Sequence, residues 1–302
     1  MSTVAVRAPA KVNVHLAVGP LRPDGFHELR TVYLAVSLFD TVTVGPGDGL
    51  SLALTGEGAG AVPTDGRNLV WRAAELLATH AGVPADATIE VRKAIPAAAG
   101  LAGGSADAAA ALVALDHLWG TGAARSDLLD LAAQLGSDVP FSLHGGVALG
   151  SGRGEELSPV LARTPTHWVL GIAGEGLSTP SVYAELDRLR AEGRVPADGL
   201  EAPVEPVIAA LRSGSPADLA PALANDLQAP ALTLRPDLRR ALRAATDAGA
   251  IASLVSGSGP TVAALAVDEQ SAVRVAAELA GVGVFRTVRA VHGPVPGARL
   301  VN

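Results

Sequence analysis

Polar and apolar residues alternate near the start of the chain and predict a β-strand over residues 4–18. Side chains of a strand point alternately to its two faces. The apolar face carries Val12, Val14 and Leu16, and the polar face carries Lys11, Asn13 and His15. Two interpretations stay open: an edge strand with a solvated face, where lysine is common, or a polar face that lines a cleft. Pro9 is expected to interrupt this strand at an edge or a bulge.

Strands and helices are interspersed along the rest of the chain. Runs rich in β-branched residues and leucine predict strands at residues 31–44, 50–54, 87–91, 147–149, 168–172, 261–267 and 284–291. Apolar residues at helical spacing predict helices at residues 68–80, 126–135, 236–249 and 269–280, and a further helix that starts at residue 179. Asn68, Ser126 and Thr179 are the expected N-caps of three of these helices.

The stretch that organises the chain is residues 96–119. Gly100, Gly103 and Gly104 allow the backbone to bend sharply and to approach a ligand closely. Ser105 is the expected N-cap of an Ala-rich helix that follows. A glycine loop that leads into a helix presents unpaired N–H groups and the positive end of the helix dipole, so the pattern predicts a phosphate site. A tight turn before a core helix is the alternative.

Two named nucleotide-binding motifs do not fit this stretch. No lysine follows Gly104, as the motif G-x-x-x-x-G-K-[ST] requires. Ala102 also breaks the spacing of the dinucleotide-binding fingerprint G-x-G-x-x-G. A different kind of phosphate loop is therefore expected.

Composition limits the classes of function. The 302 residues are 49% hydrophobic and fit one large or two modest domains. There is no cysteine, which excludes disulfides, thiolate nucleophiles and Cys-ligated zinc. A net charge of −7 without a basic run argues against nucleic-acid binding. No long uncharged apolar run and no signal-peptide pattern are present, so a cytoplasmic protein that does not bind membranes is expected.

Residues 96–106 resemble the second motif, P-x-x-x-G-L-G-[SG]-S-[SA], of the GHMP small-molecule kinases, which include galactokinase, homoserine kinase and mevalonate kinase. In that family this loop wraps the phosphates of ATP. The resemblance implies the same role for Pro96, Ala97, Ala98, Ala99, Gly100, Leu101, Ala102, Gly103, Gly104, Ser105 and Ala106. Ala98 and Ala102 stand where the motif often has glycine. Since alanine adds only a methyl group, the loop is expected to survive if these positions tolerate its backbone angles.

Two short segments resemble catalytic motifs of the same family. Residues 8–13 contain P-A-K-[VIL]-N, whose lysine lies near the reacting hydroxyl in one branch, the 4-diphosphocytidyl-2-C-methyl-D-erythritol kinases. Residues 136–141 match G-[SA]-D-V-P-F, whose aspartate is the catalytic acid/base. The resemblance implies that Lys11 and Asp138 are catalytic. The pairing is chemically sensible, because a nearby lysine keeps a carboxylate ionised and able to accept a proton.

The segment after the turn Pro23-Asp24-Gly25 indicates which substrate is expected. Phe26 and His27 follow this turn, and an aromatic ring beside a histidine can stack on and hydrogen-bond a planar ring. The segment resembles R-x-D-G-[YF]-H-x-[LI], a signature of the diphosphocytidyl branch, in which the aromatic residue and the histidine hold cytosine. Residues 256–261 resemble the third family motif, [ST]-G-[ST]-G-[PA]-[TC].

The resemblance implies further site residues. Substrate-binding positions would be Asn13, Phe26, His27, Thr179, Tyr183, Gly257, Ser258 and Gly259. Asn68 and Lys93 match positions near the base and ribose of ATP, although an N-cap and a surface lysine are equally good interpretations of these two residues. Mg²⁺ would accompany ATP, with Ser105 as a candidate ligand.

The resemblance covers nearly the whole chain. It implies a two-domain α+β fold, in which residues 1–157 form an N-terminal ATP-binding domain similar to ribosomal protein S5 domain 2 and residues 158–302 a ferredoxin-like C-terminal domain. The implied reaction is ATP-dependent phosphorylation of the 2-hydroxyl of 4-diphosphocytidyl-2-C-methyl-D-erythritol in the methylerythritol phosphate route to isoprenoids. Two alternatives are a kinase of the same family with another small-molecule substrate, and a non-catalytic regulator with the same fold.

Overall fold

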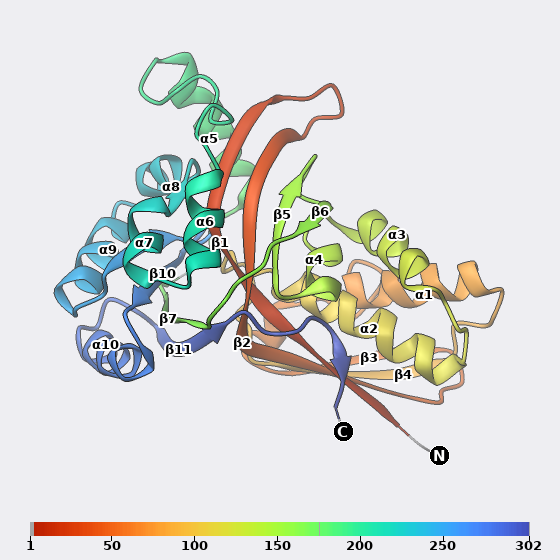
Figure 1. Cartoon of the computed structure of the whole chain (residues 1–302). Coiled ribbons are helices and arrows are strands. Elements are labelled where there is room, and N and C mark those ends of the chain that lie inside the picture. The colour runs from red at the N-terminus through yellow and green to blue at the C-terminus, as the bar shows by residue number, and fades with distance from the viewer. Residues whose placement is uncertain (1–2, 175, 302) are drawn as a thin grey trace.

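Two long antiparallel strands, β1 (Val4–Leu21) and β2 (His27–Gly45), form the centre of the first sheet. The computed structural model describes residues 3–174 and 176–301. In Figure 1 these two strands run upward together into a hairpin. β1 continues through Pro9, and its pairing with β2 shifts register between Pro9 and Ala10, so the expected interruption is a local irregularity within one strand.

The first sheet has the strand order β12-β1-β2-β4-β3, and three short strands join it at the sides. Besides β1 and β2, the main order contains β3 (Leu50–Gly56), β4 (Ala87–Lys93) and β12 (Arg299–Leu300). The three short strands at the sides are β5 (Val147–Ser151), β6 (Glu156–Pro159) and β8 (Ala224–Asn225). Because β1 is paired on both sides and its polar face is buried, the edge-strand interpretation is wrong. The polar face belongs to the interior of the protein.

Four helices cover one side of this sheet (Figure 1). They are α1 (Leu69–Ala81), α2 (Gly103–Trp119), α3 (Arg125–Leu135) and α4 (Val139–His144). α2 is buried along most of its length, and its many alanines let it lie close to the sheet and to its neighbouring helices. A short 3₁₀ turn, η1 (Ala59–Ala61), follows β3.

The second sheet is antiparallel, with the order β11-β7-β10-β9. Its strands are β7 (Thr166–Ile172), β9 (Ala252–Val255), β10 (Thr261–Ala266) and β11 (Thr287–Gly293). The helices of this half are α5 (Thr179–Ala191), α6 (Glu205–Ser213), α7 (Pro216–Leu219), α8 (Gln228–Leu234), α9 (Leu238–Asp247) and α10 (Glu269–Gly281), and a 3₁₀ turn η2 (Ala220–Ala222) follows α7. α9 and α10 pack on the sheet through Ala241, Ala245, Ala272 and Val275.

Most predicted elements are present, and the α+β class is confirmed. Three N-cap assignments are wrong. α2 starts at Gly103, three residues earlier than an N-cap at Ser105 predicts, so Ser105 lies inside its first turn. The residue before α3 is Ala124 rather than Ser126. The backbone N–H of Ala124 donates a hydrogen bond to the side chain of Asp127. Ser178 rather than Thr179 is the residue before α5, and its hydroxyl accepts from the N–H of Ser181.

The proposed division of the chain between residues 157 and 158 falls within β6. Two strands from beyond that point, β8 and β12, pair with β1, so the two proposed domains share the first sheet. No helix in the ranges that the structure describes is both long and apolar enough to span a bilayer.

Candidate active site

The polar face of β1 carries a lysine in an unusually enclosed position. Lys11 is 6% exposed, and its Nζ donates a hydrogen bond of 2.6 Å to Oδ1 of Asn13. Asn13 in turn donates from Nδ2 to the hydroxyl of Thr31 over 2.8 Å. This chain of bonds orients the asparagine oxygen toward the lysine. The ammonium is therefore held in one place rather than free to swing into solvent.

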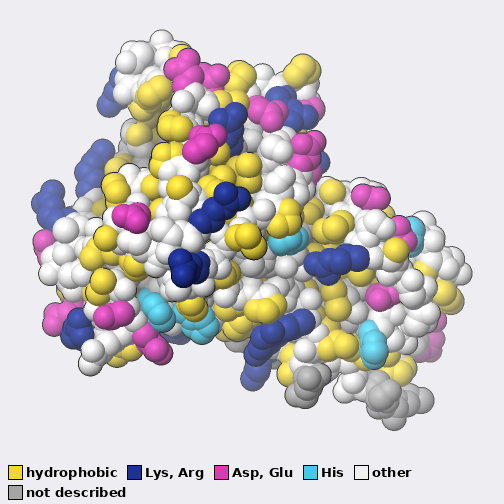
Figure 2. Space-filling model, viewed as in Figure 1, with side chains coloured by type: hydrophobic (Ala, Val, Ile, Leu, Met, Phe, Trp, Pro, Cys, Tyr) yellow, Lys and Arg dark blue, Asp and Glu magenta, His cyan; other side chains and the backbone are white. Residues whose placement is uncertain are grey.

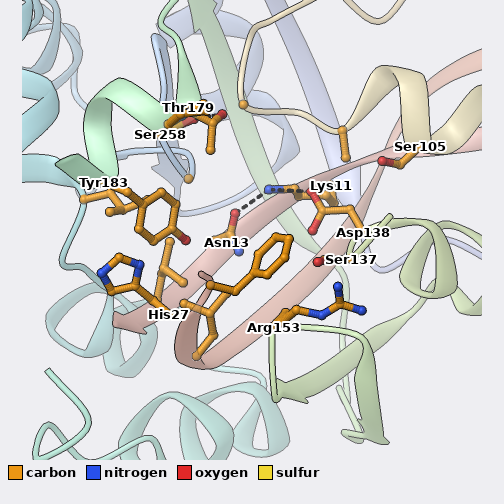
Figure 3. Close-up of a pocket in the computed structure, with 18 of the residues that line it drawn as sticks. Lys11, Asn13, His27, Ser105, Ser137, Asp138, Arg153, Thr179, Tyr183 and Ser258 are labelled. Carbon is orange, nitrogen blue, oxygen red and sulfur yellow. Dashed lines mark hydrogen bonds and ion pairs between the residues drawn. The ribbon is translucent and has the colours of Figure 1, made fainter. Parts of the chain in front are cut away.

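Asp138, the residue that precedes α4, faces this lysine. Its Oδ2 lies 3.7 Å from Lys11 Nζ, as the dashed line in Figure 3 marks. The hydroxyl of Tyr33 donates a 3.1 Å hydrogen bond to Oδ1. The side chain of Asp138 does not cap α4, so both its oxygens are directed to the site. The result is a carboxylate with two donors on one side and an open cavity on the other.

Tyr33 is a rigid hydrogen-bond donor. It is 2% exposed and stacks on Phe141, with 4.8 Å between the ring centroids. Burial raises the pKa of Tyr33 well above its ordinary value, and the negative charge of Asp138 raises this pKa further. The phenol consequently keeps its proton at neutral pH and donates a hydrogen bond to Asp138.

A cavity of about 690 Å³ opens beside this pair. Its lining comes from β1, β2, the loop before α2, the residues before α4, the β5–β6 turn, α5 and the segment after β9. The polar residues at its wall are Lys11, Asn13, His27, Tyr33, Ser105, Ser137, Asp138, Arg153, Thr179, Tyr183, Asp187 and Ser258. Figure 3 shows how the labelled ones lie around one space.

The loop before α2 forms one wall of this cavity. Ala98 and Ala102 have φ of 51° and 58°, and they are the two non-glycine residues with positive φ among those described. The two departures from the glycine-rich motif thus fall on left-handed positions, which alanine adopts at a cost. Gly100, with φ of 76°, cannot be replaced in this way, because an added Cβ would lie 2.3 Å from the carbonyl oxygen of Ser256.

The first turn of α2 faces the same space. Gly103, Gly104 and Ser105 line the cavity, and their position at the start of a 17-residue helix turns unpaired N–H groups and the positive dipole end toward it. Ser105 contributes a hydroxyl from within this turn. The arrangement is suited to binding phosphate oxygens.

A glycine-rich segment after β9 closes the wall from the second sheet. Ser256 donates from its hydroxyl to the carbonyl oxygen of Gly100 over 3.1 Å and so joins this segment to the loop before α2. A Cβ on Gly257 would lie 3.1 Å from Oδ1 of Asn13 and 3.4 Å from Lys11 Nζ. Ser258 and Thr179 line the cavity and share a 2.9 Å hydrogen bond between their hydroxyls.

Aromatic rings gather at the other end of the cavity. Phe26 is 48% exposed at the tip of the β1–β2 hairpin, although its side chain is large and apolar. His27 stacks on Tyr183 with 5.0 Å between ring centroids, and its Nε2 lies 2.9 Å from Oδ1 of Asp187. When the Nε2–H of the neutral ring donates this hydrogen bond to Asp187, Nδ1 is left as an acceptor. This end can therefore stack and hydrogen-bond a planar polar ring.

Two site candidates lie away from the cavity. The side chain of Asn68 is the N-cap of α1: it accepts from Val70 N at 2.8 Å and donates to Pro63 O at 2.7 Å. The surface interpretation of Lys93 is wrong, because this residue is 4% exposed and its Nζ lies 2.5 Å from both Asp40 and Asp107. Within the motif segment, Pro96, Ala97, Leu101 and Ala106 do not reach the cavity wall, and neither does Gly259.

Comparisons with known proteins match this architecture. The family of GHMP kinases N terminal domains matches residues 68–146, and the family of GHMP kinases C terminal domains matches residues 207–284. A curated protein of Rhodococcus jostii named 4-diphosphocytidyl-2-C-methyl-D-erythritol kinase is 60% identical over 299 residues, which is 99% of this chain and 95% of that relative. The chain belongs to the GHMP kinase family.

Solved structures agree with the GHMP kinase assignment. A crystal structure of a 4-(cytidine 5′-diphospho)-2C-methyl-D-erythritol kinase is 37% identical, with a TM-score of 0.77 over 95% of this chain and 98% of that chain. A homoserine kinase from Cytophaga hutchinsonii has a TM-score of 0.78 at 19% identity, over 100% of this chain and 98% of that one. The second likeness shows the GHMP kinase fold alone.

Four polar residues of the cavity wall were not assigned to the site by sequence reasoning. They are Tyr33, Ser137, Arg153 and Asp187. Asp187 had a usable signal, because it follows Tyr183 by four positions on a predicted helix and must share its face. Tyr33 and Arg153 carried none, since a tyrosine in a strand and an arginine in a glycine-rich turn are ordinary residues until the chain folds.

Proposed function

We propose that this GHMP kinase transfers the γ-phosphoryl group of ATP to the 2-hydroxyl of 4-diphosphocytidyl-2-C-methyl-D-erythritol, giving the 2-phosphate and ADP in the non-mevalonate route to isoprenoids. The observation that carries the proposal is the placement of the Lys11–Asp138 pair in one cavity, between the loop before α2 and the aromatic end. Relatives about 60% identical over the full chain, named for this substrate, support the choice.

Asp138 is proposed as the acceptor of the hydroxyl proton. As the O–H bond of the 2-hydroxyl breaks, its oxygen bonds to the γ-phosphorus, the bond from that phosphorus to the β–γ bridging oxygen breaks, and ADP leaves. The proton passes to a carboxylate oxygen of Asp138. Lys11, 3.7 Å away, offsets the charge that develops on the transferred group and orients Asp138.

The loop before α2 and the first turn of α2 are proposed to hold the triphosphate. Their backbone N–H groups supply donors without titratable side chains, and the helix dipole adds favourable potential. This placement directs the γ-phosphorus toward the hydroxyl held by Lys11, Asn13 and Asp138. Positioning of this kind supplies much of the catalysis in phosphoryl transfer.

Mg²⁺ fits the proposed ATP site with few protein ligands. No cluster of three or more His, Cys, Asp or Glu suited to a metal occurs in residues 3–174 and 176–301. The hydroxyl of Ser105 at the cavity wall is the proposed protein ligand, and phosphate oxygens would complete the shell, as Mg²⁺ commonly allows. Bound there, the ion would neutralise charge on the β- and γ-phosphates.

Phe26, His27 and Tyr183 are proposed to hold the cytosine. With Asp187 fixing Nε2 of His27, Nδ1 is free to accept from the exocyclic amine of cytosine. Thr179, Gly257 and Ser258 would border the methylerythritol portion near the reacting hydroxyl.

The test is an ADP-release assay with ATP and Mg²⁺ that compares the cytidyl methylerythritol substrate with mevalonate, homoserine and galactose. Turnover with the cytidyl compound alone is expected. Turnover with another alcohol would keep the kinase and remove the substrate assignment of Phe26 and His27. ATP binding without any turnover would instead support the regulator alternative.

A further inference from the structure

Arg153 is a charged residue of the cavity that the proposed reaction leaves without a role. It lies in the turn between β5 and β6, and its side chain is 30% exposed. Among the described residues that line the cavity, Lys11 and Arg153 are the two with a permanent positive charge. Lys11 already donates a hydrogen bond to Asn13 and forms an ion pair with Asp138. Arg153 is therefore the cation available to a ligand.

The guanidinium group of Arg153 is held from one edge. Its Nε donates to Oε1 of Glu155 over 3.0 Å, and the backbone N–H of Arg153 donates to Oε2 of the same carboxylate over 2.6 Å. The guanidinium carbon lies 4.9 Å from the centroid of the Phe26 ring. In the part of the chain that the structure describes, neither Nη atom of Arg153 has a hydrogen-bond partner. A fixed fork with free donors is suited to a phosphate group.

The backbone ties this turn to the hairpin that carries Phe26. Gly152, the neighbour of Arg153, donates from its N–H to Oε1 of Glu28 over 3.1 Å and accepts from the N–H of Leu29 over 2.8 Å. Arg153 therefore moves with the proposed cytosine end of the cavity. In Figure 3, Arg153 and Ser105 lie on opposite sides of Asp138, so the arginine faces the reaction centre from the side away from the first turn of α2.

We propose that Arg153 binds the phosphate groups attached to the cytidine of the substrate, with its guanidinium aligned by Phe26 and Glu155. It makes the site select a cytidine carrying phosphates over cytidine itself. This inference rests on the proposed substrate. The charge balance supports it, because a chain of net charge −7 needs a local cation to accept a dianionic or trianionic ligand beside Asp138 and Glu155.

Two sources of phosphate could reach this arginine, the cytidyl substrate and ATP. The stacking on Phe26 and the tie to the β1–β2 hairpin favour the cytidyl substrate. If Arg153 served ATP, its removal would change the KM for ATP and leave the KM for the cytidyl substrate unchanged. The two sources are therefore distinguishable by kinetics.

The test measures binding of cytidine, CMP and CDP by calorimetry, with a non-hydrolysable ATP analogue at saturation to block the ATP site. Wild type is expected to bind CDP about 10–100 times more tightly than cytidine, the usual worth of charge-assisted hydrogen bonds. Arg153→Met should lose most of this preference and keep its cytidine affinity within a few-fold. Arg153→Lys should be intermediate, because it keeps the charge and loses the planar fork.

The matched control is Arg22→Met. Arg22 lies on the same hairpin as Phe26, pairs with Asp24 and Glu28, and does not line the cavity. Its loss removes the same charge and should leave the CDP preference unchanged. The inference is overturned if Arg153→Met keeps the wild-type ratio, if wild type shows no preference for CDP, or if only the KM for ATP responds.

Failure of the inference and failure of the proposed function give different results. Turnover of the cytidyl methylerythritol substrate by wild type, with an unchanged CDP preference in Arg153→Met, would overturn the inference alone. Absence of both turnover and binding of any cytidine compound would overturn both. Thermal unfolding of each variant separates loss of binding from loss of the fold.

Discussion

Lys11 Nζ lies 3.7 Å from Oδ2 of Asp138, so that a strand of the first sheet and the start of α4 bring a buried ammonium and a carboxylate into one ion pair. Because Asp138 is proposed as the proton acceptor, Asp138→Asn should lower kcat by about 10²–10⁴, the usual worth of general-base catalysis. Steady-state ADP release measures this directly. The fold should be preserved, since the side chain of Asp138 caps no helix end.

The control for this prediction is Asp130→Asn, which removes an exposed carboxylate from α3. Its kcat should equal that of wild type. An Asp138→Asn enzyme that works within a few-fold of wild type would remove Asp138 from the proposed role.

Phe26 should contribute to substrate binding and little to chemistry. Its ring is 48% exposed at the cavity mouth, where burial against a planar base is favourable. We expect Phe26→Ala to raise the KM for the cytidyl substrate about 10-fold, in line with about 1–3 kcal/mol for stacking of one base on an aromatic side chain. The KM for ATP should stay constant.

The conservative variant Phe26→Tyr keeps the ring and should keep the KM of wild type. Were Phe26→Ala to leave the KM for the cytidyl substrate unchanged, the stacking assignment would fail. A change in the KM for ATP alone would place the ring beside the other nucleotide.

Ala98 and Ala102 should be weak points of stability in the loop before α2. Both adopt left-handed φ, which costs an L-residue about 1–2 kcal/mol, while glycine is free of this penalty and loses more entropy on folding. We therefore expect Ala98→Gly and Ala102→Gly each to raise the free energy of unfolding by roughly 0.5–1 kcal/mol. Urea unfolding at a fixed pH measures the difference.

Ala97→Gly supplies the comparison within the same loop. Ala97 is not among the residues with positive φ, so glycine there adds only entropy to the unfolded state and should lower stability slightly. Equal effects at positions 97 and 102 would show that the left-handed angles carry no strain.

The buried cluster of Asp40, Lys93 and Asp107 should make stability depend on pH. Burial, together with the negative charge of Asp40, raises the pKa of Asp107 to about 8 despite the neighbouring Lys93. The ordinary value is 3.8, so between these two pH values the folded chain holds a proton that the unfolded chain releases. The stabilisation is full below the lower value and is lost as pH rises toward the higher one.

Asp107→Asn should flatten this part of the stability curve. Urea unfolding at several pH values between about 5 and 8 would show the wild-type free energy falling by at most about 1.4 kcal/mol per pH unit from this one group. Asp247→Asn, at an exposed position at the end of α9, should keep the wild-type slope. An unchanged slope in Asp107→Asn would mean that this carboxyl does not titrate in that range.

Local patterns predicted the parts of the site that depend on local geometry. The period of two in β1 separated Lys11 and Asn13 from the core face, and the glycine pattern marked Gly100, Gly103 and Gly104, which line the same cavity. The same patterns located most helices within a few residues. The N-caps were harder to predict than the helices. Several neighbouring residues can precede a helix, and a local pattern fixes the first helical residue only to within one or two positions.

Contacts between distant segments were not accessible in this way. The alternation in β4 gave no sign that Lys93 meets Asp40 and Asp107, which come from a different strand and from α2. Likewise, nothing in the sequence places Arg153 over Phe26, because that contact forms only when the β5–β6 turn lies against the β1–β2 hairpin. Such pairs follow from how the first sheet, its turns and α2 pack together, which local sequence patterns do not reveal.

The pairing of β1 with β8 and β12 determines how early the first sheet can be completed during synthesis. His15 and Leu16 pair with Ala224 and Asn225, and Val6 and Arg7 pair with Leu300 and Arg299. The strand that carries Lys11 leaves the ribosome long before its neighbours on one side, because these lie more than 200 residues later in the chain. One border of β1 therefore stays unpaired until residues 224–225 and 299–300 have been made.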